Sequence, residues 1–154
     1  MIQKQIIAKL IVGILFCIPV FSTMAQQSKV DSIVHLLQKY KTNKGLDTLT
    51  FYDARELIRN TVLTDFNISR IENSAEVLKK GTDEDLFYII KYAILSSLTT
   101  SDNSRAIDYG RENLEKLESS KTPRSQVLRI GFLWELRLPY RNSNRLPEGF
   151  QFYT

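Results

Sequence analysis

Few side chains in this sequence have the types and spacing that catalysis or metal binding requires. His35 is the only histidine, and the residues near it in sequence do not complete the set of partners that a metal site or a general base requires. Ser96 and Ser97 lack the G-x-S-x-G context and the local histidine of a serine nucleophile. Cys17 is the only cysteine, which excludes a site built from several thiolates. We therefore expect His35 on a helix surface, no enzyme activity, and no metal or cofactor.

The charged residues follow patterns that are typical of solvated helix faces. Glu112 and Lys116 stand four positions apart, the spacing of a stabilising surface pair on a helix. The segment 121–145 holds six basic residues and a single acid, Glu135. Such a segment can bind an acidic partner or phosphate. The alternative is that the long arginine side chains cover apolar helix surface, and we favour this interpretation.

The first 25 residues have the order of a secretory signal peptide. Lys4 and Lys9 precede an uncharged apolar run over 10–21, and small or uncharged residues follow as far as Ala25. The run is shorter than the ~20 apolar residues that a membrane-spanning helix needs. We predict that residues 1–25 are a signal peptide cleaved after Ala25, with membrane contact only if it stays uncleaved.

The expected product, residues 26–154, is one exported domain, periplasmic or otherwise outside the cytoplasm. Phe16 stands where a lipoprotein signal requires a small residue before the cysteine, so Cys17 is expected to be part of the signal core. Removing Lys4 and Lys9 lowers the formal charge from +4 to +2. An exported, nearly neutral domain is a poor candidate for binding nucleic acid.

Apolar residues recur at helical spacing through the rest of the chain, and no strand pattern interrupts them. Asn67 is the expected N-cap of the third helix, and Pro139 is expected to end the sixth, with a loop over 139–147. The run 86–98 is apolar almost all round, which predicts a helix packed on two or more sides. Short turns between helices predict antiparallel neighbours. The expected helices cover about 30–42, 48–64, 68–80, Thr82 to Leu98, 106–119, 122–138 and a segment that begins at Glu148.

The stretch AIDYGRENLEKL (106–117) resembles the second helix of a tetratricopeptide repeat (TPR). That family favours an alanine, an aliphatic residue, an acid and a tyrosine at the start of this helix, and here these are Ala106, Ile107, Asp108 and Tyr109. The resemblance covers about 49–154, with the helix at 30–42 as a cap. It implies an all-α fold of antiparallel helix pairs stacked as a TPR-like α-solenoid, with six to seven helices after the signal peptide. Another helical bundle is the alternative.

Small residues are expected where paired helices cross closely. Ala93 and Gly131 lie midway along two expected first helices, and Ala75 and Gly149 take the place of Ala106 in two further second helices. The separation of Ala75 from Ala106 is 31 positions, shorter than the ~34 of the family. The repeat is therefore degenerate, and the segment 148–154 reads as an incomplete last repeat.

The combination of a signal peptide, an irregular first helix and loosely spaced repeats is similar to the exported sensory region of bacterial TPR-containing sensor kinases and regulators. The resemblance implies a protein- or peptide-interaction module. A sensory part of a signal-transduction protein is one role that such a module would fit. A helical carbohydrate- or nutrient-binding protein at the outer membrane is the alternative. Trp134 is expected in the core. By resemblance, the groove-facing residues would be Ile90, Ile94, Leu128, Phe132 and Glu135.

The segment GFQFY (149–153) carries three aromatic residues. A single helical turn is not stable by itself, and a repeat array needs a polar capping helix. We therefore expect self-association through this C-terminal segment.

Overall fold

The computed structural model describes residues 24–39, 48–79, 84–120 and 124–150, and every regular element in these ranges is a helix. This confirms the predicted all-α class. The seven α-helices and one short 3-10 helix are an N-terminal helix over residues 24–39, α2 (Thr48–Arg59), α3 (Asp65–Ala75), η1 (Glu76–Lys79), α4 (Glu84–Ser101), α5 (Asn103–Ser119), α6 (Ser125–Asn142) and α7 (Leu146–Phe150). Over the same ranges, no helix combines the length and apolar character needed to cross a membrane.

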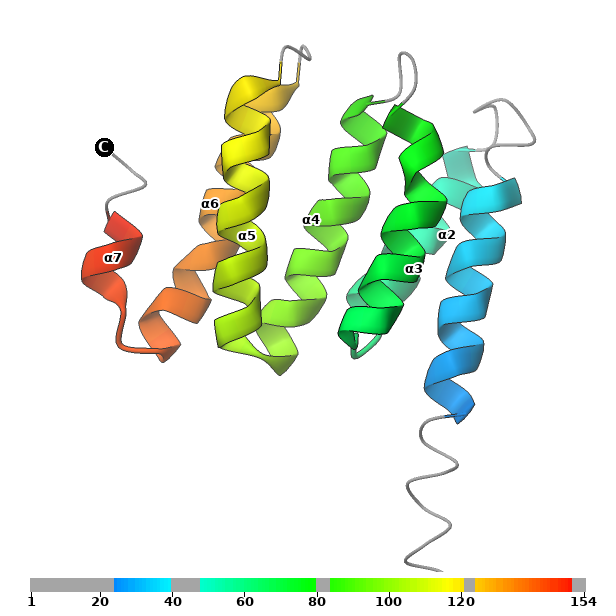
Figure 1. Cartoon of the computed structure of the whole chain (residues 1–154), viewed down its shortest axis with the longest axis horizontal. Helices are drawn as coiled ribbons and strands as arrows, with labels where there is room; N and C mark the ends of the chain where they lie inside the picture. The colour runs from blue at the N-terminus through cyan, green and yellow to red at the C-terminus, as the bar shows by residue number, and fades with distance from the viewer. Residues whose placement is uncertain (1–23, 40–47, 80–83, 121–123, 151–154) are drawn as a thin grey trace, which may run out of the picture.

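Consecutive helices run in alternating directions and lie side by side along the long axis of the molecule (Figure 1). The N-terminal helix is at one end and α7 is at the other, with α2 behind α3 and α6 behind α5 in this view. The N-terminal helix starts earlier than the expected 30–42. Val30, Ile33 and Leu37, which share one face of this helix, are buried. An ion pair of 2.8 Å between Arg70 of α3 and Asp31 ties it to its neighbour.

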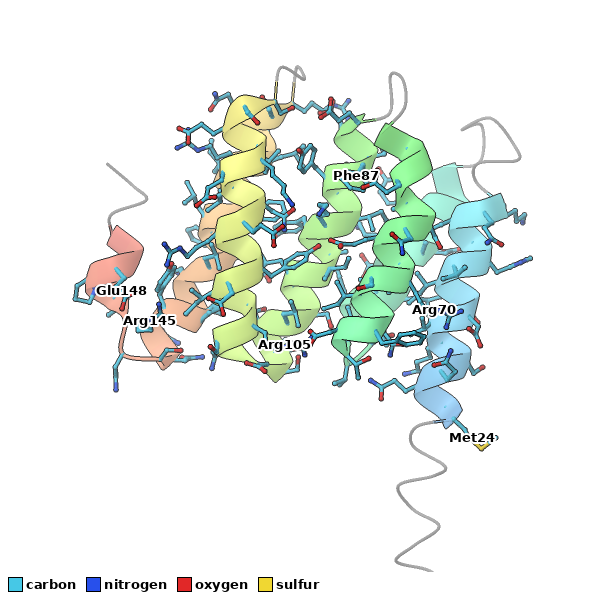
Figure 2. All side chains as sticks on the ribbon, in the orientation of Figure 1. Met24, Arg70, Phe87, Arg105, Arg145 and Glu148 are labelled. Carbon is cyan, nitrogen blue, oxygen red and sulfur yellow. The ribbon has the colours of Figure 1, made fainter. Side chains whose placement is uncertain are left out.

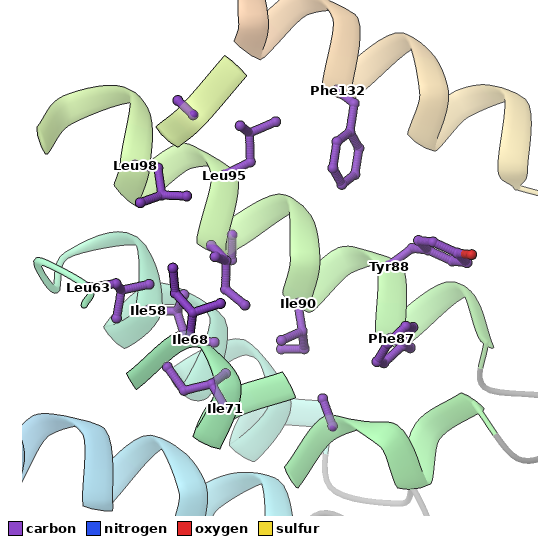
Figure 3. Packing of buried hydrophobic residues seen from close by; sticks show 14 of the residues in the cluster. Ile58, Leu63, Ile68, Ile71, Phe87, Tyr88, Ile90, Leu95, Leu98 and Phe132 are labelled. Carbon is purple, nitrogen blue, oxygen red and sulfur yellow. The ribbon is translucent and has the colours of Figure 1, made fainter. Parts of the chain in front are cut away.

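Helix α4 is the centre of the fold and contacts α2, α3, α5 and α6. Figure 3 shows Ile90 and Leu98 of α4 beside apolar side chains of the α2–α3 pair, whereas Phe132 of α6 approaches from another side. Even Ser97 is buried on this helix, and its hydroxyl donates to the carbonyl of Thr61. The prediction that the apolar run 86–98 packs on several sides is therefore confirmed.

Two helix boundaries differ from the sequence prediction. The N-cap of α3 is Thr64, whose hydroxyl accepts from the amide of Asn67 at 3.3 Å, so Asn67 lies inside the first turn. Pro139 does not end α6, which continues to Asn142 and includes half of the predicted loop. Pro139 lacks only its own N–H, and its carbonyl still accepts from Ser143 at 3.0 Å. Because this proline is also buried, packing holds it within the last turn of the helix.

The small residues separate into two groups. Ala75, Ala93 and Ala106 have no exposed area, as expected for residues at helix contacts. Gly131 differs from the prediction, because a Cβ atom there would meet the Tyr92 ring at an ordinary 3.5 Å. A tight contact between α5 and α6 is found instead at Gly110, where a Cβ would lie 2.6 Å from a methyl carbon of Leu136.

Candidate functional site

Helix α6 carries apolar side chains on two opposite faces. Phe132, Leu136 and Tyr140, spaced four apart, point into the core. Trp134 lies two positions from Phe132 and from Leu136, about 200° around the helix from each, and is therefore on the far side. It is 62% exposed, which corrects the prediction that it belongs to the core.

The outer face of α6 forms a continuous apolar stripe. Trp134 stands between Val127 and Ile130 on one side and Leu138 on the other, at positions i, i+3, i+7 and i+11. Val127, Ile130 and Leu138 are 69%, 66% and 39% exposed. Four large apolar side chains aligned on one helix face are a contiguous patch, and such patches mark interaction sites. We call these four residues the α6 stripe.

Arginine is the charged residue that accompanies the α6 stripe. The guanidinium of Arg137 lies over the Trp134 ring, 4.3 Å from its centre, at the middle of the stripe. Arg141, one turn further along, is also on this face and exposed. Neither arginine forms an ion pair with a carboxylate of the described residues. The face is therefore apolar and positively charged, and its two guanidinium groups have no carboxylate partner among the described residues.

The acid of α6 is turned away from this face. Glu135 accepts from the hydroxyl of Tyr92 at 3.0 Å and from that of Thr99 at 3.3 Å, both on α4. Burial and the charge of Glu135 raise the pKa of Tyr92 above its ordinary value. On the side that faces α5, Arg129 pairs with Glu118 at 3.5 Å. Within the described part of the chain, charges are thus matched where α6 meets its neighbours and unmatched on its outer face.

The residues expected to line a groove are mostly internal. Ile90, Ile94 and Phe132 have no exposed area, so they contact other core residues and cannot reach a ligand in this structure. Leu128 and Glu135 are partly buried on the side of α6 that faces α4. The repeat pattern therefore selected faces on which α4 and α6 contact other parts of the core.

A concave region, polar in character, lies between α3, α4 and α5 and has a volume of about 340 Å³. At its base Lys91, 6% exposed, donates to Glu72 at 2.9 Å, and the Tyr109 hydroxyl donates to the same carboxylate oxygen at 2.7 Å. The ammonium also lies 5.7 Å from the Tyr109 ring centre. Burial and the neighbouring Glu72 charge raise the pKa of Tyr109 well above its ordinary value.

The cations at the rim of this polar region are paired as well. Arg105 donates to the carbonyl of Leu63 at 2.9 Å and forms an ion pair with Asp65, which joins α5 to the start of α3 (Figure 2). Lys116 pairs with Glu112, as predicted from their spacing. The cations of this polar region therefore all have carboxylate partners, and we interpret the region as a network that holds α3, α4 and α5 together.

His35, the remaining candidate for chemistry among the described residues, lies outside both of these regions. His35 is exposed on the N-terminal helix, as expected. Within the described ranges no group of three or more histidine, cysteine or acidic residues is placed to hold a metal ion. Cys17 and most of the predicted signal peptide lie in residues 1–23, outside the described ranges. Ala25 and Gln26, which flank the predicted cleavage point, lie in the first turn of the N-terminal helix, and cleavage stays a prediction.

Sequence reasoning missed both the α6 stripe and the Glu72–Lys91–Tyr109 network. A signal for the stripe was present, since Val127, Ile130, Trp134 and Leu138 repeat at helical spacing beside the core residues of the same helix. The network has no local signal, because Glu72, Lys91 and Tyr109 come from three different helices. Comparisons of the chain with protein-family models, curated proteins and solved structures found no match.

Proposed function

We propose that this chain is a TPR-like protein-interaction module that works outside the cytoplasm and binds a protein or peptide through the α6 stripe. The observation that carries the proposal is the stripe itself. An exposed Trp134 between Val127, Ile130 and Leu138 is the type of aromatic anchor around which binding energy concentrates at protein interfaces.

The order of helix contacts supports the TPR-like part of the proposal. Pairing the helices in chain order makes α2, α4 and α6 the first helices of three successive pairs. The contacts within the α4–α5 and α6–α7 pairs agree with this order, whereas α2 packs chiefly on α4. Helix α4 then touches the first helices on both sides, and α5 touches the next first helix, α6. In a stacked repeat each unit contacts only its neighbours, and this contact order is of that kind.

The resemblance to exported sensory regions adds a signalling role to the proposal, with occupancy of the α6 stripe as the input. The alternative, a carbohydrate- or nutrient-binding protein, would use the polar region between α3 and α5. That region has polar side chains, but Lys91, Arg105 and Lys116 are already paired to carboxylates there. A protein-interaction function is therefore the better supported of the two.

Site-specific photo-crosslinking in the source cells tests the proposal. A photoreactive amino acid replaces Ile130 in the stripe or, as the matched control, the exposed Glu115 on α5. We expect a discrete adduct from position 130 in the exported fraction and none from position 115. The adduct should disappear when Trp134→Ala is added. Equal adducts from both positions, or none from any stripe position, would refute the proposed interaction function.

A further inference from the structure

We propose that the occupant of the α6 stripe is an acidic amphipathic helix of a partner protein. This inference rests on the proposed function and names the class of partner. Three properties of the surface lead to it, namely its length and periodicity, the sign of its charge, and the absence of compensating acids.

The shape of the stripe suits a helix. Val127 and Leu138 are eleven positions apart, so the stripe is roughly 16 Å long at ~1.5 Å per residue. That is about three turns, the length over which an amphipathic helix presents apolar anchors at i, i+3 or i+4, and i+7. The ring of Trp134 stands at the middle, where the central anchor of such a helix would lie.

The charge of the surface selects an acidic partner. Arg137 and Arg141 are exposed beside the stripe without a carboxylate from the described residues, and Glu135 is engaged by α4. Contact with the Trp134 ring holds the Arg137 guanidinium at the centre of the face. Guanidinium groups bind carboxylates through two parallel hydrogen bonds, so glutamate or aspartate beside the apolar anchors of the partner would satisfy both arginines.

The same charges disfavour a second copy of this chain. The exposed face of α6 supplies arginines and no exposed acid, so a symmetric α6–α6 contact would cover four guanidinium groups with no carboxylate from either stripe. Covering unpaired charges is costly. An acidic helix removes this cost, whereas a basic helix would increase it.

Trp134 fluorescence can test this inference. Trp134 is the only tryptophan of the chain, so its emission reports on the α6 stripe alone. The exported protein is titrated with three helix-stabilised peptides that lack tryptophan and share one leucine stripe, with flanking glutamate, glutamine or lysine. We expect the Trp134 emission to shift to the blue when the glutamate peptide binds. This peptide should bind at least tenfold more tightly than the lysine peptide, and added salt should weaken its binding.

Variants that remove one charge each test whether the arginines themselves contribute to binding of the acidic peptide. Arg137→Gln and Arg141→Gln should each lower the affinity for the glutamate peptide by about fivefold and leave the affinity for the glutamine peptide unchanged. Arg129→Gln is the matched control on the same helix, because Arg129 is already paired with Glu118. It should leave the affinity for all three peptides unchanged. Circular dichroism establishes that each variant is folded.

The other outcomes overturn the inference in distinguishable ways. Equal binding of all three peptides, lost in Ile130→Ser, would overturn the acidic-partner inference and leave the proposed function intact. A blue shift with anionic phosphatidylglycerol vesicles but with no peptide would make the surface a membrane contact. A concentration-dependent shift of the protein alone, with dimers in sedimentation that Trp134→Ala abolishes, would make the occupant a second copy. The crosslinking experiment decides the proposed function independently of these results.

Discussion

The same substitution, glycine to alanine, is expected to have opposite effects at two positions where α6 meets its neighbours. At Gly110 of α5, an added Cβ would lie 2.6, 2.8 and 2.9 Å from three side-chain carbons of Leu136. At Gly131 of α6, the nearest atom would be a ring carbon of Tyr92 at 3.5 Å. Both glycines are inside α-helices, so the intrinsic helix preference for alanine acts equally on the two.

The magnitude follows from two opposing contributions. Alanine stabilises a helix interior by about 1 kcal/mol relative to glycine. At Gly131 this gain stands nearly alone, so the free energy of unfolding should rise by about 0.5–1 kcal/mol. At Gly110 the Leu136 side chain must move, although it is only 2% exposed and has little free space. Overpacking of this kind costs about 1–3 kcal/mol, which leaves a net loss of about 1 kcal/mol.

Thermal denaturation followed by circular dichroism measures both effects. We expect Gly110→Ala to lower the melting temperature by roughly 3–4 °C and Gly131→Ala to raise it slightly. Combining Gly110→Ala with Leu136→Ala should cost less than the sum of the single substitutions, because the smaller side chain removes the clash. If Gly110→Ala is as stable as the wild type, or if the double variant is simply additive, the close approach of α5 to α6 at this point is refuted.

Three further predictions concern the interior network, its response to pH and a helix cap. Glu72→Ala should destabilise the protein more than Lys91→Met, by roughly 2 kcal/mol, because the first change leaves a buried ammonium without its countercharge whereas the second removes that charge. Urea titrations of both variants and of the double variant measure this difference, and equal losses would contradict it. The pKa of Tyr109 in the folded protein is raised above its ordinary value of 10.0, so the unfolded chain releases this proton first. Stability should be fully present below pH 10 and fall as the pH rises above it, and Tyr109→Phe should flatten this fall in melting curves recorded between pH 9 and 12. Asp102 is the N-cap of α5 and accepts from the amide of Arg105 at 3.1 Å, so Asp102→Ala should cost about 1 kcal/mol in a urea titration, whereas Asp102→Asn should stay close to wild type.

The sequence alone determined the helical class and most element positions. Apolar periodicity, capping residues and chain-breaking glycine are local features, and local features decide where a helix forms. The helix expected over 106–119 begins three residues earlier, at Asn103, because Asp102 caps it from the adjacent position. The burial of Ala106 and the central place of α4 also followed from residue types, since a small residue and an all-round apolar helix both require close neighbours.

The tertiary structure decided which apolar faces are covered. Helix α6 has two apolar stripes, and periodicity treats them alike. Phe132 is buried because α4 and α5 pack against its side of the helix, whereas Trp134 is exposed because no described helix covers the opposite side. The same reason explains why Pro139 continues the helix, since surrounding packing holds it there, and why Gly110 rather than Gly131 marks a tight contact. Burial depends on the neighbour that a face meets, and that neighbour is set by the arrangement of all the helices, which no single segment of the chain encodes.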